Sequence, residues 1–228
     1  MRLVIKLGGS IFFESSNKIN THLVAAYADL MRKFQKLGHK LGVVIGGGNL
    51  AKNYITQIRQ FAFPESIYDE IGIAFTRINA YTFCILLGDV AVLPVPTNWN
   101  EILPHLANNK IIVIGGMQPG QSTNAVSAIL AEFLRADYLI NLTNVDGVYD
   151  RHPSLPDAKL ITKLNYKTFK KIVSSQDSHA GRYPLFDLVA LSIAERSKLK
   201  IVFLNGLTPD NLHKFVINGE ISGSIVSE

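Results

Sequence analysis

Short apolar runs rich in β-branched residues recur along the chain, and segments with helical periodicity lie between most of them. The runs cover residues 2–7, 41–45, 90–95, 111–114, 138–142, 200–204 and 221–226. Strand-length runs that alternate with helical segments are typical of parallel strands joined by helical crossovers. The pattern therefore predicts an α/β fold, a three-layer αβα sandwich with a central, mainly parallel sheet covered by helices on both faces.

Two of the helical segments differ in how their apolar residues are distributed. In residues 21–37 the apolar side chains fall on one stripe and Gly38 supplies a stop, which predicts an amphipathic helix packed on the sheet. In residues 67–87 the apolar side chains cover more than one face. A helix that is apolar nearly all round is either wholly buried or shared with another subunit. We interpret this segment as an oligomer interface.

Composition narrows the class of protein. At 228 residues the chain can form one sizeable domain, and 47% hydrophobic with 18% charged residues is an ordinary balance for a folded protein. No uninterrupted apolar run approaches the roughly 18 residues of a membrane span, and the N-terminus lacks the features of a signal peptide. The single cysteine, Cys84, can form no internal disulfide. We expect a cytoplasmic protein without a membrane partner.

The net charge of +5 is compatible with a nucleic-acid binder, but the basic residues are scattered and form no stripe interleaved with aromatic residues. A mildly positive field also suits ligands that carry phosphate. We therefore expect no nucleic-acid partner. Residues 150–181 are polar, proline-containing and basic, which predicts a small excursion from the sheet of the kind in which loops and lids carry function.

Three glycine-rich segments each follow a predicted strand. They are Gly8-Gly9, Gly46-Gly47-Gly48, and the stretch from Gly115-Gly116 to Gly120. In an open parallel sheet, ligands bind outside the carboxyl ends of the strands, where glycine lets backbone N–H groups approach an anion. Any one of these segments is explained equally well as a tight turn. Three at equivalent places in one sheet favour a phosphate-binding site.

Charged and polar residues accompany these glycines. Most lysines are solvated, but Lys6 lies at the carboxyl end of the first strand, where it could stabilise charge on a transferring phosphoryl group. The strand at 138–142 delivers Thr143 and Asn144 to the same edge of the sheet. Asp146 begins an Asp-Gly pair, which is a common turn on its own. Its carboxylate could also hold lysines in place or help to organise Mg²⁺, and Lys159 could reach the phosphates from the opposite side.

Common nucleotide motifs are missing from the sequence. It contains no G-x-x-x-x-G-K-[ST] and no G-x-G-x-x-G after the first strand, which disfavours P-loop kinases and dinucleotide-binding domains. Instead, residues 6–10, 46–48 and 143–149, taken together in order and spacing, resemble the amino acid kinase family over essentially the whole chain. The resemblance implies a carbamate kinase-like fold, a single domain with an acceptor-binding lobe at residues 1–125 and an ATP-binding lobe at residues 126–228.

Within this family, Asp69 with residues 76–80, and residues 115–123, resemble the members that phosphorylate UMP, in the short form similar to archaeal enzymes. The counterpart of Asp69 binds the ribose hydroxyls, and Gly47 resembles a UMP contact. Seven consecutive positions resemble the segment that wraps the uracil and the acceptor phosphate: Met117, Gln118, Pro119, Gly120, Gln121, Ser122 and Thr123. The positions that resemble ATP contacts are Gly9, Ser10, Gly48, Lys52, Thr143, Asn144 and Tyr149.

Two positions depart from the family pattern. His152 stands where relatives usually have Asp in an ATP-facing loop, and Asn124 stands where many have Asp. The first puts an ATP contact at position 152 in doubt. The second leaves the acceptor loop plausible, and neither departure touches Lys6 or Asp146.

The resemblance implies transfer of the γ-phosphoryl group of ATP to UMP, giving UDP and ADP, with Mg²⁺ carried by ATP rather than held in a protein metal site. The second pKa of the UMP phosphate is about 6, so the nucleophile is already charged at pH 7 and needs no strong general base. Positioning and charge neutralisation remain. We assign Lys6 to the transferred group, Asp146 to holding the cations in register, and Lys159 to a second cation. Backbone N–H groups of residues 8–10, beginning at Gly8, would bind ATP phosphates.

Two alternatives stay open at this point. One is another kinase of the family, acting on carbamate, an amino-acid carboxylate or an isoprenoid phosphate. The other is a non-catalytic anion-binding protein on the same scaffold. The resemblance further implies a homo-oligomer, a homohexamer built from dimers, and a place in pyrimidine nucleotide biosynthesis.

Overall fold

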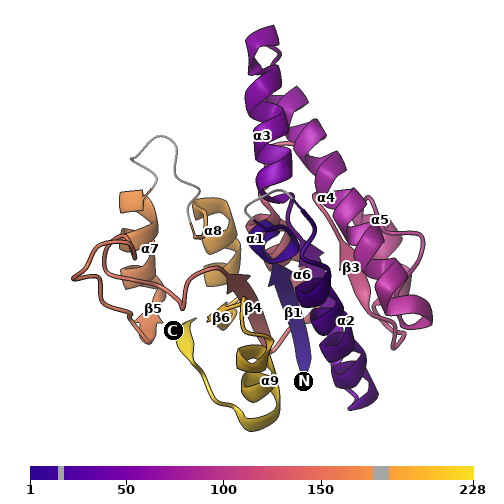
Figure 1. Ribbon diagram of the computed structural model, residues 1–228. Coiled ribbons are helices and arrows are strands. Elements are labelled where there is room, and N and C mark those ends of the chain that lie inside the picture. The colour runs from indigo at the N-terminus through magenta and orange to yellow at the C-terminus, as the bar shows by residue number, and fades with distance from the viewer. Residues whose placement is uncertain (15–17, 177–184) are drawn as a thin grey trace.

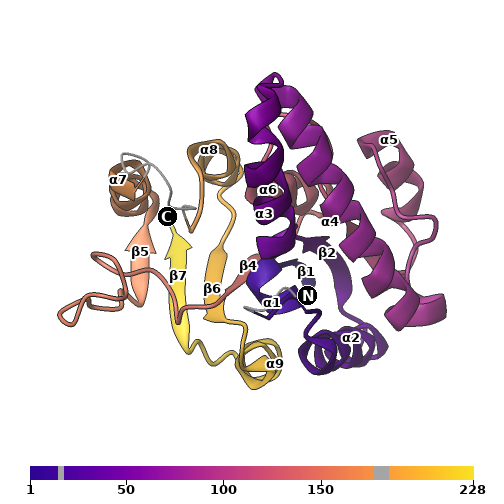
Figure 2. The same ribbon diagram turned by 45° about the horizontal axis from the view of Figure 1, so that its top comes forward.

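A seven-stranded sheet forms the centre of the part of the chain that the computed structural model describes, residues 1–14, 18–176 and 185–228 (Figures 1 and 2). The strands are β1 (Arg2–Leu7), β2 (Lys40–Ile45), β3 (Ile112–Ile114), β4 (Tyr138–Thr143), β5 (Lys163–Asn165), β6 (Ile201–Asn205) and β7 (Gly223–Ser227). Their order is β3-β2-β1-β4-β6-β7-β5. The first five of these run parallel, β7 is antiparallel to β6, and β5 is parallel to β7. The predicted mainly parallel sheet is confirmed.

Helices cover both faces of the sheet. The α-helices are α1 (Gly9–Phe12), α2 (Thr21–Lys36), α3 (Gly48–Ile58), α4 (Glu65–Leu87), α5 (Trp99–Ile102), α6 (Thr123–Leu134), α7 (Tyr166–Gln176), α8 (Leu188–Arg196) and α9 (Pro209–Asn218). The 3-10 turns are η1 (Arg59–Phe61), η2 (Gly88–Val90) and η3 (Leu103–His105). Side chains of α1, α2, α4 and α9 share one apolar core with the sheet, and those of α5 to α8 share the other. Figure 2 shows α2 and α9 on one side and α7 and α8 on the opposite side. The predicted three-layer sandwich is confirmed.

The two cores explain the apolar runs. In β1, Leu3, Ile5 and Leu7 enter the core under α2, whereas Val4 enters the core under α6, because successive side chains of a strand alternate between the faces. All four are at most 1% exposed. Since both faces are covered, the strand reads as a continuous apolar run. Lys6 is two residues after Val4, so its side chain lies on the same, α6-covered face of the sheet, near the carboxyl end of β1.

Two sequence predictions about elements were wrong. Residues 90–95 form no strand: η2 ends at Val90, and only Ala91 makes an isolated bridge to Ile111. Proline at 94 and 96 cannot donate to a ladder, which explains the early end. The stretch at 150–181 is an excursion only as far as residue 162, since β5 and α7 then return to the edge of the sheet. Residues 177–181 of that stretch lie outside the described residues.

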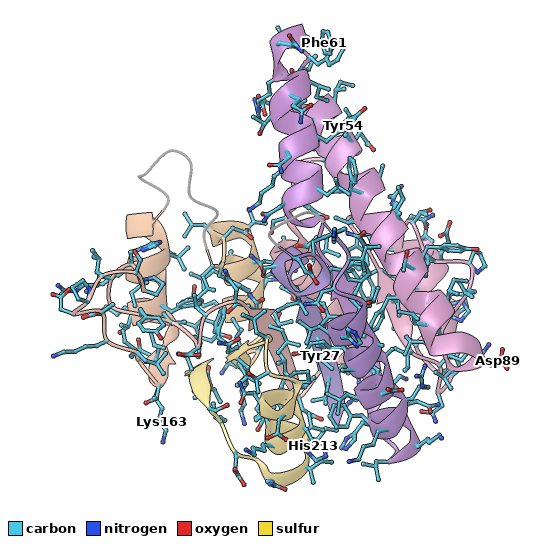
Figure 3. The ribbon with its side chains drawn as sticks, in the orientation of Figure 1. Tyr27, Tyr54, Phe61, Asp89, Lys163 and His213 are labelled. Atoms are coloured by element: carbon cyan, nitrogen blue, oxygen red, sulfur yellow. The ribbon has the colours of Figure 1, made fainter. Side chains whose placement is uncertain are left out.

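Helix α4 has two contrasting faces. Its buried face includes Tyr68, Thr76, Asn79 and Phe83, and the side away from the core exposes large apolar residues: Ile67, Ile78, Tyr81, Ile85 and Leu86. Together, α3 and the first part of α4 project past the carboxyl edge of the sheet (Figure 1). Tyr54 and Phe61 lie on this projection (Figure 3). The apolar residues on more than one face, expected from the sequence, are thus present, and the helix is not wholly buried.

By length and composition alone, the stretch Glu65–Val90 is the one helical segment of the described residues that could cross a membrane. This carries little weight, because core helices of soluble proteins pass the same test. The inner side of α4 packs on β2 and β3.

Candidate active site

A cavity of about 720 Å³ opens at the carboxyl ends of the central strands. Fourteen of the predicted catalytic and nucleotide-contact residues line it: Lys6, Gly8, Gly9, Ser10, Gly47, Gly48, Lys52, Asp69, Gly120, Gln121, Ser122, Thr123, Thr143 and Asn144. They come from segments far apart in the chain and include candidates for both the ATP side and the acceptor side. The sheet topology brings them to one edge, as expected for ligand sites in open parallel sheets.

The glycine loops after β1 and β2 touch each other through their backbones. A Cβ atom placed on Gly9 would lie 2.0 Å from the Cα atom of Gly48, far inside any real contact. Gly48 also has a φ of +71°, a conformation that residues with a side chain rarely adopt. Glycine is therefore required at both positions, and the two loops meet with no side chain between them.

Helix N-termini surround the cavity. α3 begins at Gly48, and α6 is capped by Ser122, whose hydroxyl oxygen accepts hydrogen bonds from the backbone N–H groups of Asn124 and Ala125, both at 3.1 Å. The Ser122 hydroxyl in turn donates to Asp187, which caps α8 by accepting from Ala190 N–H at 2.9 Å. The positive ends of these helices favour negatively charged groups between them.

Lys6 is the most perturbed cation of the site. It is 9% exposed, and burial lowers the pKa of its ammonium group to about 8, an effect that the Asp187 carboxylate opposes and the Lys52 ammonium reinforces. Partial burial also lowers the pKa of Lys52. Two cations that disfavour each other's charge are both relieved by a bound anion. The site is thus built to receive negatively charged groups.

Asp69 links α4 to the loop that precedes α6. Its Oδ2 atom accepts a hydrogen bond from the Gly120 N–H at 2.8 Å. The neighbouring Gln121 lines the same cavity, and its buried Oε1 atom has no hydrogen-bond partner among the described residues. Such an atom is costly unless a ligand satisfies it.

Four other predicted residues lie outside the cavity lining, in or after the turn that follows β4. Asp146 accepts hydrogen bonds from Asn205 Nδ2 at 2.9 Å and from the Tyr149 hydroxyl at 3.2 Å. The backbone N–H of Lys159 donates to the Asp150 carboxylate at 2.9 Å. The ring of His152 pairs with the Ser154 hydroxyl. The charges that act on Lys6 are those of Asp187 and Lys52, and Asp146 is not among them.

The uracil-side segment divides in the same way. Gly120, Gln121, Ser122 and Thr123 line the cavity, whereas Met117, Gln118 and Pro119 do not. Met117 is 8% exposed and packs in the core under α6, which is ordinary for an apolar side chain.

The carboxylate that acts on Lys6 is Asp187, which sequence reasoning missed. A carboxylate directly before an apolar helical segment is a common N-cap signal and could have drawn attention to this residue. Thr76, Tyr68 and Leu185 also line the cavity without having been singled out as site residues.

The fold and this edge of glycine loops, lysines and helix N-termini define a protein built to hold phosphate groups. Comparison with known proteins gives the family: residues 1–205 match the amino acid kinase family, and the chain belongs to it. It is 40% identical to a uridylate kinase of Methanobrevibacter smithii over 229 aligned positions and to one of Sulfurisphaera tokodaii over 230. Each alignment covers at least 99% of this chain and of the relative. Among solved structures, uridylate kinase from Archaeoglobus fulgidus superposes with a TM-score of 0.86 at 35% identity over the full length of both chains.

Proposed function

We propose that this protein is a UMP kinase that transfers the γ-phosphoryl group of ATP to UMP. The observation that carries the proposal is one cavity in which Lys6 lies among the glycine loops, with Asp69 and with Thr143 and Asn144 from the second half of the chain in the same lining. Full-length similarity to proteins described as uridylate kinases supports the same choice of acceptor.

In the proposed reaction, an oxygen of the UMP phosphate attacks the γ-phosphorus of ATP and the bond to the β,γ-bridging oxygen breaks, giving UDP and ADP. The attacking phosphate is mostly dianionic at pH 7, its second pKa being about 6, so no side chain has to remove a proton. The chain's task is to align the two anionic groups and neutralise their charge. Lys6 would stabilise the transferred group, and Lys52, which lines the same cavity, would also stabilise its negative charge.

We propose that Asp187, rather than Asp146, holds the cations of the site in register. Its carboxylate favours the charged form of Lys6, and its hydrogen bonds to Ser122 and to the first turn of α8 fix its position. Asp146 instead orders the turn after β4 through Asn205 and Tyr149. Lys159, Tyr149 and His152 remain candidates for the ATP side only if their loop closes over the nucleotide.

Mg²⁺ fits this site as an ion carried by ATP. Among the described residues, no group of three or more His, Cys, Asp or Glu side chains could hold a metal ion by itself. When bound to the ATP phosphates, Mg²⁺ would neutralise part of their charge. The Thr143 hydroxyl, which lies at the same edge of the sheet, donates to the Val145 carbonyl at 2.8 Å and so orders the turn after β4.

The unpaired Gln121 Oε1 atom gives a reason for selecting uracil. The imide N–H of uracil is a donor, whereas the corresponding ring nitrogen of cytosine is an acceptor. An amide oxygen left unpaired by the protein favours the base that can donate to it. We therefore expect UMP to be preferred over CMP.

We further infer an acceptor lobe at residues 1–125 and an ATP lobe at residues 126–228, and a cytoplasmic homo-oligomer in which the exposed side of α4 meets another subunit, with a hexamer as the expected state. The support is the row Ile78, Tyr81 and Ile85, each more than half exposed. An apolar row of this kind on a folded protein favours association. The UDP product would serve pyrimidine nucleotide synthesis.

The test is a coupled ADP-release assay with Mg²⁺ and ATP across UMP, CMP, dUMP, AMP, carbamate and isopentenyl phosphate. We expect the highest kcat/KM with UMP. Release without preference for UMP would reject the acceptor assignment and leave the kinase assignment standing. Saturable nucleotide binding with no ADP release in the presence of any of these acceptors would indicate a non-catalytic homologue.

A further inference from the structure

Helix α4 carries three polar residues on or beside the side that faces the glycine loops. Thr76 is 6% exposed and Asn79 is 4% exposed, in a helix whose other buried residues are mostly apolar. Positions three apart lie on the same side of a helix, and Arg77 follows Thr76 directly. The reaction proposed above gives none of the three a task, so their cost in this setting needs another explanation.

Each of the three is hydrogen-bonded to backbone of a loop that borders the cavity. Thr76 Oγ1 accepts from Gly116 N–H at 2.6 Å and donates to the Ile73 carbonyl at 2.6 Å. Asn79 Nδ2 donates to the Gly46 carbonyl at 2.9 Å. The Arg77 guanidinium donates to the carbonyls of Gly116 and Met117, both at 3.2 Å, and to that of Thr97 at 2.9 Å. One helix therefore holds the loop after β2 and the loop after β3.

The loops also touch α4 sterically. A Cβ atom on Gly115 would lie 2.6 Å from Thr76 Oγ1 and 2.8 Å from Arg77 N, and one on Gly116 would lie 2.8 Å from a side-chain carbon of Ile73. The Thr76 methyl group is 3.5 Å from the corresponding position on Gly47. Thr76 thus lies between the two loops: its methyl group packs on the loop after β2, and its hydroxyl oxygen accepts from the loop after β3 while donating to the Ile73 carbonyl of its own helix.

We propose that Thr76, Arg77 and Asn79 are positioning residues that hold these two loops against α4 at the spacing the acceptor requires. This inference rests on the proposed function, in which the loop after β3 and Gly47 of the loop after β2 belong to the acceptor side of the cavity. Most of the expected ATP contacts lie in the segments after β1 and β4, and among the described residues the three side chains bond to neither segment. Their loss should therefore weaken acceptor binding selectively.

The test compares Thr76→Val with Thr82→Val. Valine keeps the shape of threonine and removes the hydroxyl. Thr82 lies on the same helix, but its hydroxyl donates only to the Ile78 carbonyl at 3.0 Å, within the helix. With Thr76→Val we expect KM for UMP to rise about tenfold while KM for ATP stays within about twofold, since a buried N–H loses its acceptor. Thr76→Ser should restore KM for UMP, and Thr82→Val should leave both constants unchanged.

A second variant guards against loss of folding. Asn79→Leu removes the bond to Gly46 and retains size, and we expect the same selective rise in KM for UMP. Thermal unfolding and direct calorimetric titration with UMP should accompany each variant. A purely structural role would lower the melting temperature without separating the two KM values, and that result, or equal effects of Thr76→Val and Thr82→Val, would overturn the inference. If the wild type prefers another acceptor in the panel above, the proposed function fails, and the same variants measured with that acceptor still decide this inference.

Discussion

The proposed acceptor side and the proposed ATP side of this molecule are constructed differently. On the acceptor side, buried side chains of α4 bond directly to loop backbone, and the predicted residues from Gly120 to Thr123 face one cavity. On the proposed ATP side, Asp146 orders the turn after β4 through Asn205 and Tyr149, and His152 pairs with Ser154 further along; these residues do not line the cavity. Because the expected ATP contacts Tyr149 and His152 do not line the cavity, whereas the loops of the proposed acceptor side are already held by α4, we expect ATP binding to reshape the protein more than UMP binding does.

In the proposed reaction Lys6 stabilises the group that passes between the two substrates, so removing it should have the largest effect. Lys6→Met should lower kcat by about a thousandfold or more, since the charge that faces the transferred group is lost. It should also raise the free energy of unfolding at pH 7 by roughly 3 kcal/mol, because a buried ammonium whose pKa has fallen from 10.5 to about 8 destabilises the fold while it remains charged. Steady-state kinetics and urea unfolding measure the two effects. Near-normal turnover in the folded variant would remove Lys6 from the mechanism.

The pH dependence should report the same lysine. As pH rises through about 8, Lys6 of the free protein loses its proton, and kcat/KM should then fall by about tenfold per pH unit. Between pH 8 and 10.5 the unfolded chain binds more protons than the folded chain at this position, so the Lys6 contribution to the free energy of unfolding rises with pH. Profiles of kcat/KM and of stability should both lose these features in Lys6→Met. A basic limb that persists unchanged would point to another group.

Asp69 tests the acceptor side alone. Asn at this position still accepts the Gly120 N–H but loses the charge that would strengthen hydrogen bonds from ribose hydroxyls. We expect Asp69→Asn to raise KM for UMP about tenfold, with KM for ATP unchanged. Because the difference between UMP and dUMP should shrink in this variant, initial rates with both acceptors provide the check. Equal increases in KM for UMP and for ATP would contradict the division of the cavity into two sides.

His152 tests the ATP side and should show the smallest effect. Its ring is exposed and bonds to the Ser154 hydroxyl, so His152→Asp should change KM for ATP by about threefold at most. Ser154→Ala is the matched control for the loss of this contact. A change of tenfold or more would mean that the loop closes onto ATP far more tightly than its contacts in the free protein suggest.

The sequence predicts the fold well where burial is two-sided, as in β1, because covered parallel strands leave continuous apolar runs. It fails at residues 90–95, where proline defeats an apolar composition, and at β5, a three-residue edge strand whose alternate residues are exposed. In the site, the glycine loops could be predicted because three of them follow strands of one sheet. The influence of the Asp187 carboxylate on Lys6 could not be predicted from the sequence, since the two residues are 181 positions apart and their approach depends on how α8 packs.

The contact between Gly9 and Gly48 limits how this sequence can change over time. Most damaging substitutions in a packed protein can be rescued by shrinking a neighbouring side chain. At Gly9 the neighbour is the backbone of residues 47 and 48, so no second substitution could make room for a side chain there. Sequences descended from this one are therefore expected to keep Gly9, however far the helices around it diverge, and screens for suppressors of a change at this position should return only revertants.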